Sequence, residues 1–253
     1  MKNNHRFKLD IWGWITLVMC VFYGLFLLYP LAHLGKMAFY SIETNSFTLD
    51  HFTKFFSRKY YSSTLINSFK VSSATTITSL IVGTPLAYFF TMYNIKGKKI
   101  LNVLIILASM SAPFVGAYSW VLLLGRNGVV TNFVRNCFGI TPPDIYGFGG
   151  ILLVFTTQLF PLIFLYVQGA LQKVDNSLLE ASQNMGCSGI KRFFTIVLPL
   201  ISSTILAGAL LVFMRAFSDF GTPMLIGEGY RTFPVILYTE FVGEVSHELI
   251  TSH

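Results

Sequence analysis

The chain has 253 residues, of which 53% are hydrophobic and only 11% are charged. Soluble globular domains carry about 25% charged residues, so this composition excludes an ordinary soluble domain and favours a chain that faces lipid. The formal net charge is +7, but the lysines and arginines lie in short clusters between apolar stretches. This distribution is typical of membrane topology, whereas a nucleic-acid-binding protein needs its basic residues gathered on a polar domain.

The three cysteines, Cys20, Cys137 and Cys187, lie far apart and form no CxxC pair. Their spacing predicts neither a zinc site nor a disulfide framework. We interpret them as small, buried, apolar residues.

Five apolar stretches are long enough to form membrane helices, which need about 20 mostly apolar residues to cross the hydrocarbon core. They are residues 11–34, 65–93, 100–124, 149–171 and 200–220. The first is too long for the apolar region of a signal peptide and is followed by no small-x-small cleavage site, so we interpret it as a retained helix. The sequence thus predicts an all-α, polytopic transmembrane helical bundle with about five membrane helices, preceded by a short cytoplasmic segment, residues 1–10.

Basic residues in the joints between these stretches predict the orientation of the chain. They lie in the N-terminal segment, in the turn 94–99, and between the fourth and fifth stretches: Lys2, Arg6, Lys8, Lys96, Lys98, Lys99, Lys173, Lys191 and Arg192. These three joints share one side of the membrane, which the positive-inside rule assigns to the cytoplasm. The loop 35–64 on the opposite side also carries four basic residues. The charge density of the turn 94–99 nevertheless favours a cytoplasmic N-terminus in the plasma (inner) membrane.

Polar side chains inside the apolar stretches are candidates for a translocation pathway, because such groups are costly in a membrane. Ser72 and Thr76 belong to a run of Ser and Thr residues that either lines the pathway or packs helices together, and we favour packing. Gln158, in the middle of the fourth stretch, is expected to form an interhelical hydrogen bond. Arg215 and Asp219 are four residues apart and would share a helix face, as a structural ion pair or, alternatively, as an external gate.

Two features modify the helix assignment. Pro113 lies inside the third stretch, where a proline removes a backbone donor and kinks or breaks a helix. The apolar run 233–245 contains Glu240 and Glu244 and is too short to span a bilayer.

The segment between the fourth and fifth stretches predicts a helical hairpin outside the membrane. Residues 175–177 are good helix N-caps, and apolar or small residues then recur on one helical face. Gly186 can adopt the left-handed conformation that ends a helix. A second short helix, 188–197, follows, and Pro199 suits the first turn of the next membrane helix. Such a hairpin either docks into a groove on a soluble partner or lies on the membrane surface.

This segment resembles the EAA loop of ABC-importer permeases, whose pattern is EAA-x3-G-x9-I-x-LP. The chain matches every spacing, with a serine in place of the second alanine: Glu180, Ala181, Ser182, Gly186, Ile196, Leu198 and Pro199. In that family the loop, here residues 172–199, contains a coupling helix held by a cytoplasmic ATPase. The resemblance implies that Glu180 contacts the ATPase and that Gly186 sets the bend.

Four other motifs look like the ferric-iron-type subfamily of these permeases, which has 2-aminoethylphosphonate, thiamine and polyamine relatives. They are residues 125–128, 144–147, 218–223 and 230–234. The resemblance implies a type I ABC-importer permease fold over residues 11–253, similar to the N-terminal half of a double-length permease. Such permeases have a further membrane helix after the position that matches 240–244. We therefore expect the domain to be incomplete at its C-terminus.

The resemblance also implies a function and partners. The chain would form half of the translocation pathway of an ATP-driven importer, most simply for ferric iron, with the other three substrates as alternatives. Its partners would be cytoplasmic ABC ATPase subunits, a second permease half, an extracytoplasmic substrate-binding protein and the lipid bilayer. No nucleic acid, cofactor or metal site is expected.

Two rival function classes were considered. The sequence has no P-loop, no HExxH helix and no GxSxG elbow, so it lacks these common enzyme signatures and ATP hydrolysis would belong to another chain. A passive channel or a secondary transporter is the second rival. Neither needs a docking hairpin with this spacing.

Overall fold

The computed structural model describes residues 11–41, 46–93, 95–110, 112–140, 142–187 and 189–251. The chain divides into two compact units, Met1–Ser62 and Ser63–His253. Helices make up most of the described part of both units, as the all-α prediction requires.

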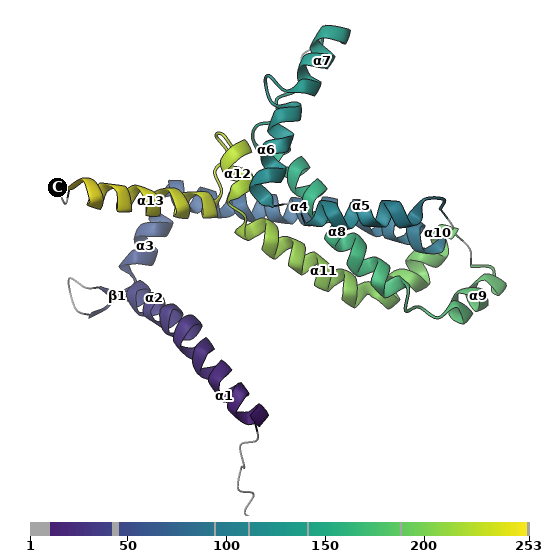
Figure 1. Ribbon diagram of the computed structural model, residues 1–253, viewed down its shortest axis with the longest axis horizontal. Helices are drawn as coiled ribbons and strands as arrows, with labels where there is room; N and C mark the ends of the chain where they lie inside the picture. The colour runs from purple at the N-terminus through teal and green to yellow at the C-terminus, as the bar shows by residue number, and fades with distance from the viewer. Residues whose placement is uncertain are drawn as a thin grey trace, which may run out of the picture. The chain divides into compact units, whose positions relative to one another are not determined.

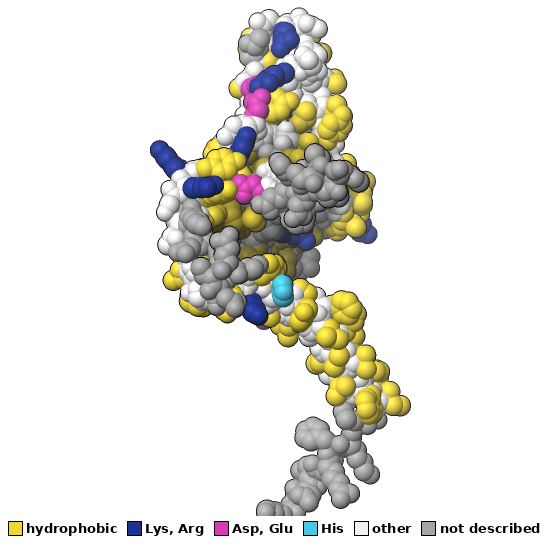
Figure 2. Space-filling model, turned by 90° about the vertical axis from the view of Figure 1, so that its left-hand side faces the viewer, with side chains coloured by type: hydrophobic (Ala, Val, Ile, Leu, Met, Phe, Trp, Pro, Cys, Tyr) yellow, Lys and Arg dark blue, Asp and Glu magenta, His cyan; other side chains and the backbone are white. Residues whose placement is uncertain are grey.

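The first unit is built around one long apolar helix. It runs through α1 (Ile11–Tyr23), the π-helical segment η1 (Gly24–Leu28) and α2 (Tyr29–Phe39). None of its residues is buried in the protein, and Figure 2 shows hydrophobic side chains over much of its visible face. Its 29 residues qualify as a candidate membrane span by length and hydropathy. The predicted stretch 11–34 is confirmed and continues to the end of α2.

A short antiparallel ladder follows this helix. β1 (Tyr40–Ser41) pairs with β2 (Ser46–Phe47), and α3 (Asp50–Ser57) comes next. The ring of Phe39 stacks on those of Phe47 and Phe52, with centroids 5.7 and 5.2 Å apart. These aromatic contacts fix the end of α2 against the ladder and α3.

The second unit holds the remaining helices, which α4 (Lys59–Met92) connects to the first unit. In chain order they are α5 (Lys98–Ser109), α6 (Pro113–Leu124), α7 (Val129–Phe138), α8 (Phe148–Leu171), α9 (Asn176–Asn184), α10 (Gly189–Arg192), η2 (Phe193–Val197), α11 (Leu198–Ser218), α12 (Gly221–Ile226) and α13 (Phe233–Thr251). Within this unit α5 and α11 pack against α8, with α9 at one end of α11 and α12 at the other (Figure 1).

α8 is the central helix of this unit, because its two halves belong to two different hydrophobic clusters. Its first half contributes Ile151, Val154 and Phe155 to a cluster with Ile226 of α12. Its second half contributes Phe164 to a cluster with residues of α4, α5, η2 and α11, among them Phe90. Both ends of the unit are therefore packed on one continuous helix.

Small residues let α4 and α11 approach α8 closely. A Cβ added to Gly83 of α4 would lie 2.9 Å from Cβ of Ile163 and 2.9 Å from the carbonyl oxygen of Phe160. A Cβ added to Gly208 of α11 would lie 3.3 Å from Cδ1 of the same Ile163. The hydroxyls of Thr78 and Thr156 share a hydrogen bond of 2.6 Å between α4 and α8. Close backbone approach and interhelical hydrogen bonds of this kind are typical of membrane helix bundles.

Among the described residues, four helices are long and apolar enough to span a membrane, or five if the bent pair α5 and α6–α7 counts as one span. The four include α4, α8 and the continuous helix Phe193–Ser218. This agrees with the prediction of about five membrane helices. α13 contains the run 233–245 and is not one of these candidates, as predicted.

The third predicted stretch, 100–124, differs most from expectation. It is not one kinked helix, because α5 ends at Ser109, α6 begins at Pro113, and the pair is bent by 106°. Proline is well suited to the first turn of a helix, where its missing N–H has no intrahelical partner. The chain therefore starts a new helix at Pro113.

The prediction of buried cysteines was wrong for two of the three. Cys20 and Cys137 are exposed, and Cys187 is half-buried. Cys20 lies on the long helix of the first unit, which buries no residue in the protein, so its apolar character serves the outer face of a candidate membrane span.

Candidate functional site

The EAA segment, residues 172–199, begins with a capped helix, α9. The backbone N–H of Ser177 donates to Oδ1 of Asp175 at 2.9 Å, which confirms Asp175 as an N-cap. Hydrogen bonds from the backbone and the side chain of Ser177 lower the pKa of the Asp175 carboxyl. Charge on this carboxylate also complements the positive end of the helix dipole.

Gly186 ends this helix in the conformation that the sequence predicted. Its φ is +78°, and no atom lies within 4 Å of the position that a Cβ would take. The N–H of Met185 donates to the carbonyl of Ala181, and that of Cys187 donates to the carbonyl of Ser182. The demand for glycine here thus comes from the backbone dihedral and not from lack of space, because L-residues strain in the left-handed region.

The motif residues divide between a packed side and an exposed side. Ser182 is 2% exposed, whereas Glu180, Ala181 and Gly186 are exposed and Met185 is 83% exposed. A small residue is required where Ser182 packs, which explains why serine can replace the alanine of the family pattern. Further along, Ile196 and Leu198 are half-buried and Pro199 is exposed. Among the motif residues of α9 whose side chains the structure describes, Ser182 is therefore packed and Glu180 and Ala181 are exposed.

Pro199 lies in the first turn of α11, as the sequence predicted, but the short helix before it runs on into α11. α10 and η2 continue into α11, and the helix from Phe193 to Ser218 is continuous. In η2 the N–H of Leu198 donates to the carbonyl of Phe193, five residues back. A π-turn rearranges the carbonyls that a proline ring would otherwise meet, so the helix absorbs Pro199 without stopping.

A cavity of about 510 Å³ lies beneath the start of α9. It is bordered by the end of α8, the residues Asp175, Ser177 and Leu178, and the first turns of α11. The start of α9 therefore borders open space between the end of α8 and the first turns of α11.

A second cavity, of about 400 Å³, lies at the other end of α11 and is called the distal cavity below. Its lining residues come from five helices and their connections: Ser109, Pro113, Phe114, Gln158, Leu159, Arg215, Ser218, Asp219, Phe220 and Gly221. It brings together Gln158, Arg215 and Asp219, three of the five residues that the sequence placed on a pathway or gate. Ser72 is fully buried and Thr76, whose hydroxyl donates to the carbonyl of Ser72, is half-buried; neither lines the distal cavity.

The expected ion pair between Arg215 and Asp219 is wrong among the residues that the structure describes. α11 ends at Ser218 and Asp219 has extended backbone dihedrals, so the two side chains do not share a helical face. The Oδ1 of Asp219 instead accepts from the N–H groups of Gly221 and Thr222, and Oδ2 accepts from the Thr222 hydroxyl. Asp219 follows the last residue of the candidate span, and burial raises the pKa of its carboxyl while these hydrogen bonds oppose that rise.

The expected interhelical hydrogen bond of Gln158 is also not found in the described part of the chain. Its Nε2 atom is buried and has no hydrogen-bond partner there. Gln158 is one of the residues that line the distal cavity.

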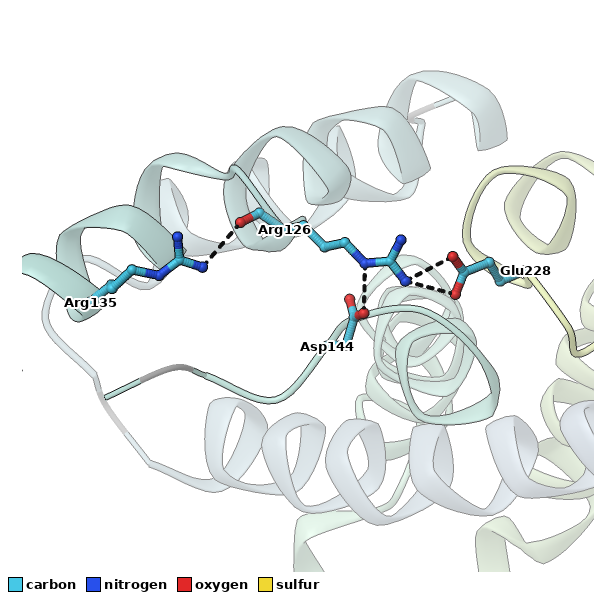
Figure 3. A network of polar contacts seen from close by, with 4 residues as sticks. All are labelled: Arg126, Arg135, Asp144 and Glu228. Carbon is cyan, nitrogen blue, oxygen red and sulfur yellow. Dashed lines mark hydrogen bonds and ion pairs between the residues drawn. The ribbon is translucent and has the colours of Figure 1, made fainter. Parts of the chain in front are cut away.

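Sequence reasoning assigned no role to an ionic network at the distal end of the unit (Figure 3). Nε of Arg126 donates to Asp144 at 2.9 Å, and a terminal nitrogen donates to both carboxylate oxygens of Glu228 at 2.8 and 3.1 Å. The guanidinium also lies 4.8 Å from the ring centroid of Tyr146. The network joins the loops before α7, before α8 and after α12. Arg126 and Asp144 belong to motifs that the sequence already marked, but their pairing joins two loops and Glu228 adds a third.

The connection from α12 to α13 is fastened to α4 by three hydrogen bonds. Nδ2 of Asn67 donates to the carbonyl of Arg231, and the Tyr230 hydroxyl donates to the carbonyl of Asn67. The N–H of Phe233 donates to the Ser68 hydroxyl at 2.8 Å. The distal end is therefore held together by side chains from distant parts of the sequence.

Comparison with known proteins decides the family. Residues 79–242, well over half of the chain, match the family described as "Binding-protein-dependent transport system inner membrane component". The chain belongs to this family of inner-membrane transport components.

This permease is similar to transport permeases with different named cargoes. It is 27% identical to the ferric transport system permease protein FbpB of Actinobacillus pleuropneumoniae, over 96% of this chain and 35% of that protein. It is 32% identical to the molybdenum transport system permease protein ModB of Escherichia coli (strain K12), over 68% of this chain and 76% of that protein. The chain spans about a third of the length of the ferric relative.

The fold of this permease matches a solved ABC transporter. A chain in the crystal structure of a bacterial alginate ABC transporter, in complex with an alginate pentasaccharide-bound periplasmic protein, superposes with a TM-score of 0.73 at 17% identity. The match covers 94% of this chain and 86% of that one. The predicted all-α, type I ABC-importer permease fold is thereby confirmed.

Proposed function

We propose that this permease forms one half of the translocation pathway of an ATP-driven importer and that α9 is the helix on which the ATPase acts. The observation that carries this proposal is the EAA segment, a short helix capped by Asp175 and ended by Gly186 in the left-handed conformation. Its exposed residues are available to a protein partner, and its buried Ser182 fixes its orientation.

The segment is also connected to the pathway in a way that suits mechanical coupling. α10, η2 and α11 form a continuous rod from Gly189 to Ser218. Arg215 lies about 24 Å along this rod from Pro199, at 1.5 Å per residue. A displacement of the EAA segment would therefore move the wall of the distal cavity as a rigid body, which is the general logic of alternating access.

The partners and orientation follow from this role. The EAA segment and the N-terminus would face the cytoplasm, where ABC ATPase subunits hydrolyse ATP. A second permease half would complete the pathway, and a substrate-binding protein would deliver the cargo from the opposite side. The coupling residues are Glu180, Ala181, Ser182, Gly186, Ile196, Leu198 and Pro199.

Ferric iron is the first choice of cargo. The motifs at 125–128, 144–147, 218–223 and 230–234 support it, together with the similarity to a ferric transport permease. The alternatives are 2-aminoethylphosphonate, a polyamine and thiamine.

Deleting residues 177–186 tests the function class. The full-length chain is co-expressed with its ATPase, and co-purification of the two is measured together with uptake. An importer subunit loses both when the segment is removed. A passive channel or a secondary transporter would keep its flux, and that result would contradict the proposal.

A further inference from the structure

We propose that the distal cavity holds an anionic, oxygen-bearing group of the cargo and that Arg215 is its principal contact. This inference rests on the proposed function and narrows the class of cargo. It predicts that the pathway carries a free oxyanion or a metal bound to an anionic chelate, and that it rejects polyamines and bare metal cations.

The first step concerns the charges that line the cavity. Of its ten lining residues, two are charged, Arg215 and Asp219. A guanidinium remains protonated in proteins, so Arg215 brings a permanent positive charge. Its side chain is exposed to the cavity and has no carboxylate partner in the described ranges of the chain.

The second step is that Asp219 does not offset this charge for a ligand. Both of its oxygens already accept hydrogen bonds from the first residues of α12, at 2.7 Å from the Gly221 N–H and 3.3 Å from the Thr222 N–H and hydroxyl. A carboxylate that caps a helix start is partly neutralised by those dipoles. The field in the cavity is therefore dominated by Arg215.

The remaining polar groups that line the cavity are uncharged. Gln158 contributes an amide whose Nε2 is buried without a partner in the described structure. Ser218 adds a hydroxyl beside Arg215 on the last turn of α11, and this hydroxyl already donates to the carbonyl of Met214 at 2.7 Å. A guanidinium with a neighbouring amide donor is a usual way for proteins to bind carboxylate, phosphate and similar oxyanions.

Cationic cargo fits the same cavity poorly. Hard cations need several oxygen ligands, and the cavity offers one carboxylate that is already hydrogen-bonded. A polyamine would meet an uncompensated arginine. The ring centroids of Phe114 and Phe220 lie 5.3 Å apart in an edge-to-face arrangement. These rings supply apolar surface beside Arg215 and Asp219 in the cavity lining.

A purely structural role of Arg215 can be distinguished from anion binding by substitution with lysine. Arg215 lies in the last turn of α11, where any cation interacts favourably with the helix dipole. Lysine would preserve that interaction but loses the planar fork that binds an oxyanion through two hydrogen bonds. A helix-dipole role therefore predicts that Arg215→Lys behaves as wild type.

Uptake by cells that express the complete transporter tests the proposal. The probes are radiolabelled molybdate, phosphate, 2-aminoethylphosphonate, ferric citrate and spermidine, and co-purification of the ATPase serves as the folding control. We expect uptake of an anionic probe, with a loss of roughly 10- to 100-fold in Arg215→Gln and an intermediate loss in Arg215→Lys. Uptake of molybdate, phosphate or phosphonate would identify a free oxyanion, and uptake of ferric citrate a chelated metal.

Three results would overturn the proposal: uptake of spermidine, uptake of ferric ion at the same rate without an anionic chelator, or unchanged uptake in Arg215→Gln. If the wild-type chain did not co-purify with the ATPase, that result would instead refute the proposed function.

A second test measures the field in the cavity without knowledge of the cargo. Ser218→Cys is placed in a chain whose three native cysteines are changed to serine, and is labelled with thiosulfonates carrying either a sulfonate or a trimethylammonium group. We expect the anionic reagent to react faster, and the ratio of the two rates to fall about 10-fold when Arg215→Gln is added. An unchanged ratio would show that Arg215 does not set the potential there.

Discussion

The two ends of α11 differ in how their geometry is encoded. At one end the EAA segment is made by neighbours in the sequence, with Asp175 capping Ser177 and Gly186 reversing the chain. At the other end the distal cavity is lined from α5, α6, α8, α11 and α12. The first end is a local backbone design that reads directly from spacing. The second exists only when distant helices pack, so its properties depend on the fold.

The largest expected effect comes from breaking the local design at Gly186. Gly186→Pro forces φ to about −65° where the structure has +78°. We expect uptake to fall at least about 10-fold, because a misdirected α9 no longer transmits ATPase movement, a barrier change of about 1.4 kcal/mol or more. Uptake and ATP hydrolysis are measured together in reconstituted vesicles, with membrane insertion unchanged.

Gly139 provides a matched control for this substitution. It also has a positive φ, +65°, after the last residue of a helix, and it also has open space at the Cβ position. Gly139→Pro lies outside the EAA segment and should retain coupled uptake. Equal losses in both variants would show that the effect is general backbone damage and not loss of coupling.

The second effect tests the packed side of the same segment. Ser182→Leu adds about two heavy atoms where the side chain is 2% exposed, and overpacking costs about 1–3 kcal/mol. We expect loss of ATPase co-purification, whereas Ser182→Ala, which restores the family pattern, should retain it. If leucine is tolerated as well as alanine, Ser182 does not orient α9.

A smaller effect is expected at the distal end from Asp219→Ala. Removing a carboxylate that satisfies the start of α12 costs about 1 kcal/mol. We expect thermal unfolding in detergent to shift down by a few degrees, with Asp219→Asn intermediate because its amide oxygen can still accept the Gly221 N–H. No shift in the alanine variant would mean that α12 does not depend on this cap.

The smallest effect is expected for the network around Arg126. Its ion pairs to Asp144 and Glu228 are largely exposed, and exposed pairs are weak and screened by salt. Arg126→Gln should lower the melting temperature slightly at low ionic strength and not at all in molar salt. A large loss that persists in high salt would show that the network is more than a surface contact.

The sequence predicted most of the helices because membrane length and hydropathy are strong constraints, as in α8 and the helix of the first unit. It predicted the EAA segment because capping and left-handed glycine are local. It did not predict that the short helix before Pro199 runs on into α11 through a π-turn, or that α5 and the helices that follow it are bent by 106°. It paired Arg215 with Asp219 by helical spacing, but the helix ends between them. Such errors arise where tertiary packing, and not the local sequence pattern, decides where a helix ends or bends.

The side of the membrane from which residue 180 is accessible is the strongest test of the proposed coupling role of α9. Glu180→Cys, in a chain whose native cysteines are changed to serine, is exposed to a membrane-impermeant thiol reagent in right-side-out and inside-out vesicles. We expect labelling only in inside-out vesicles, and protection of the cysteine when the ATPase is bound. Labelling in right-side-out vesicles would place α9 on the external face and contradict its role as the coupling helix.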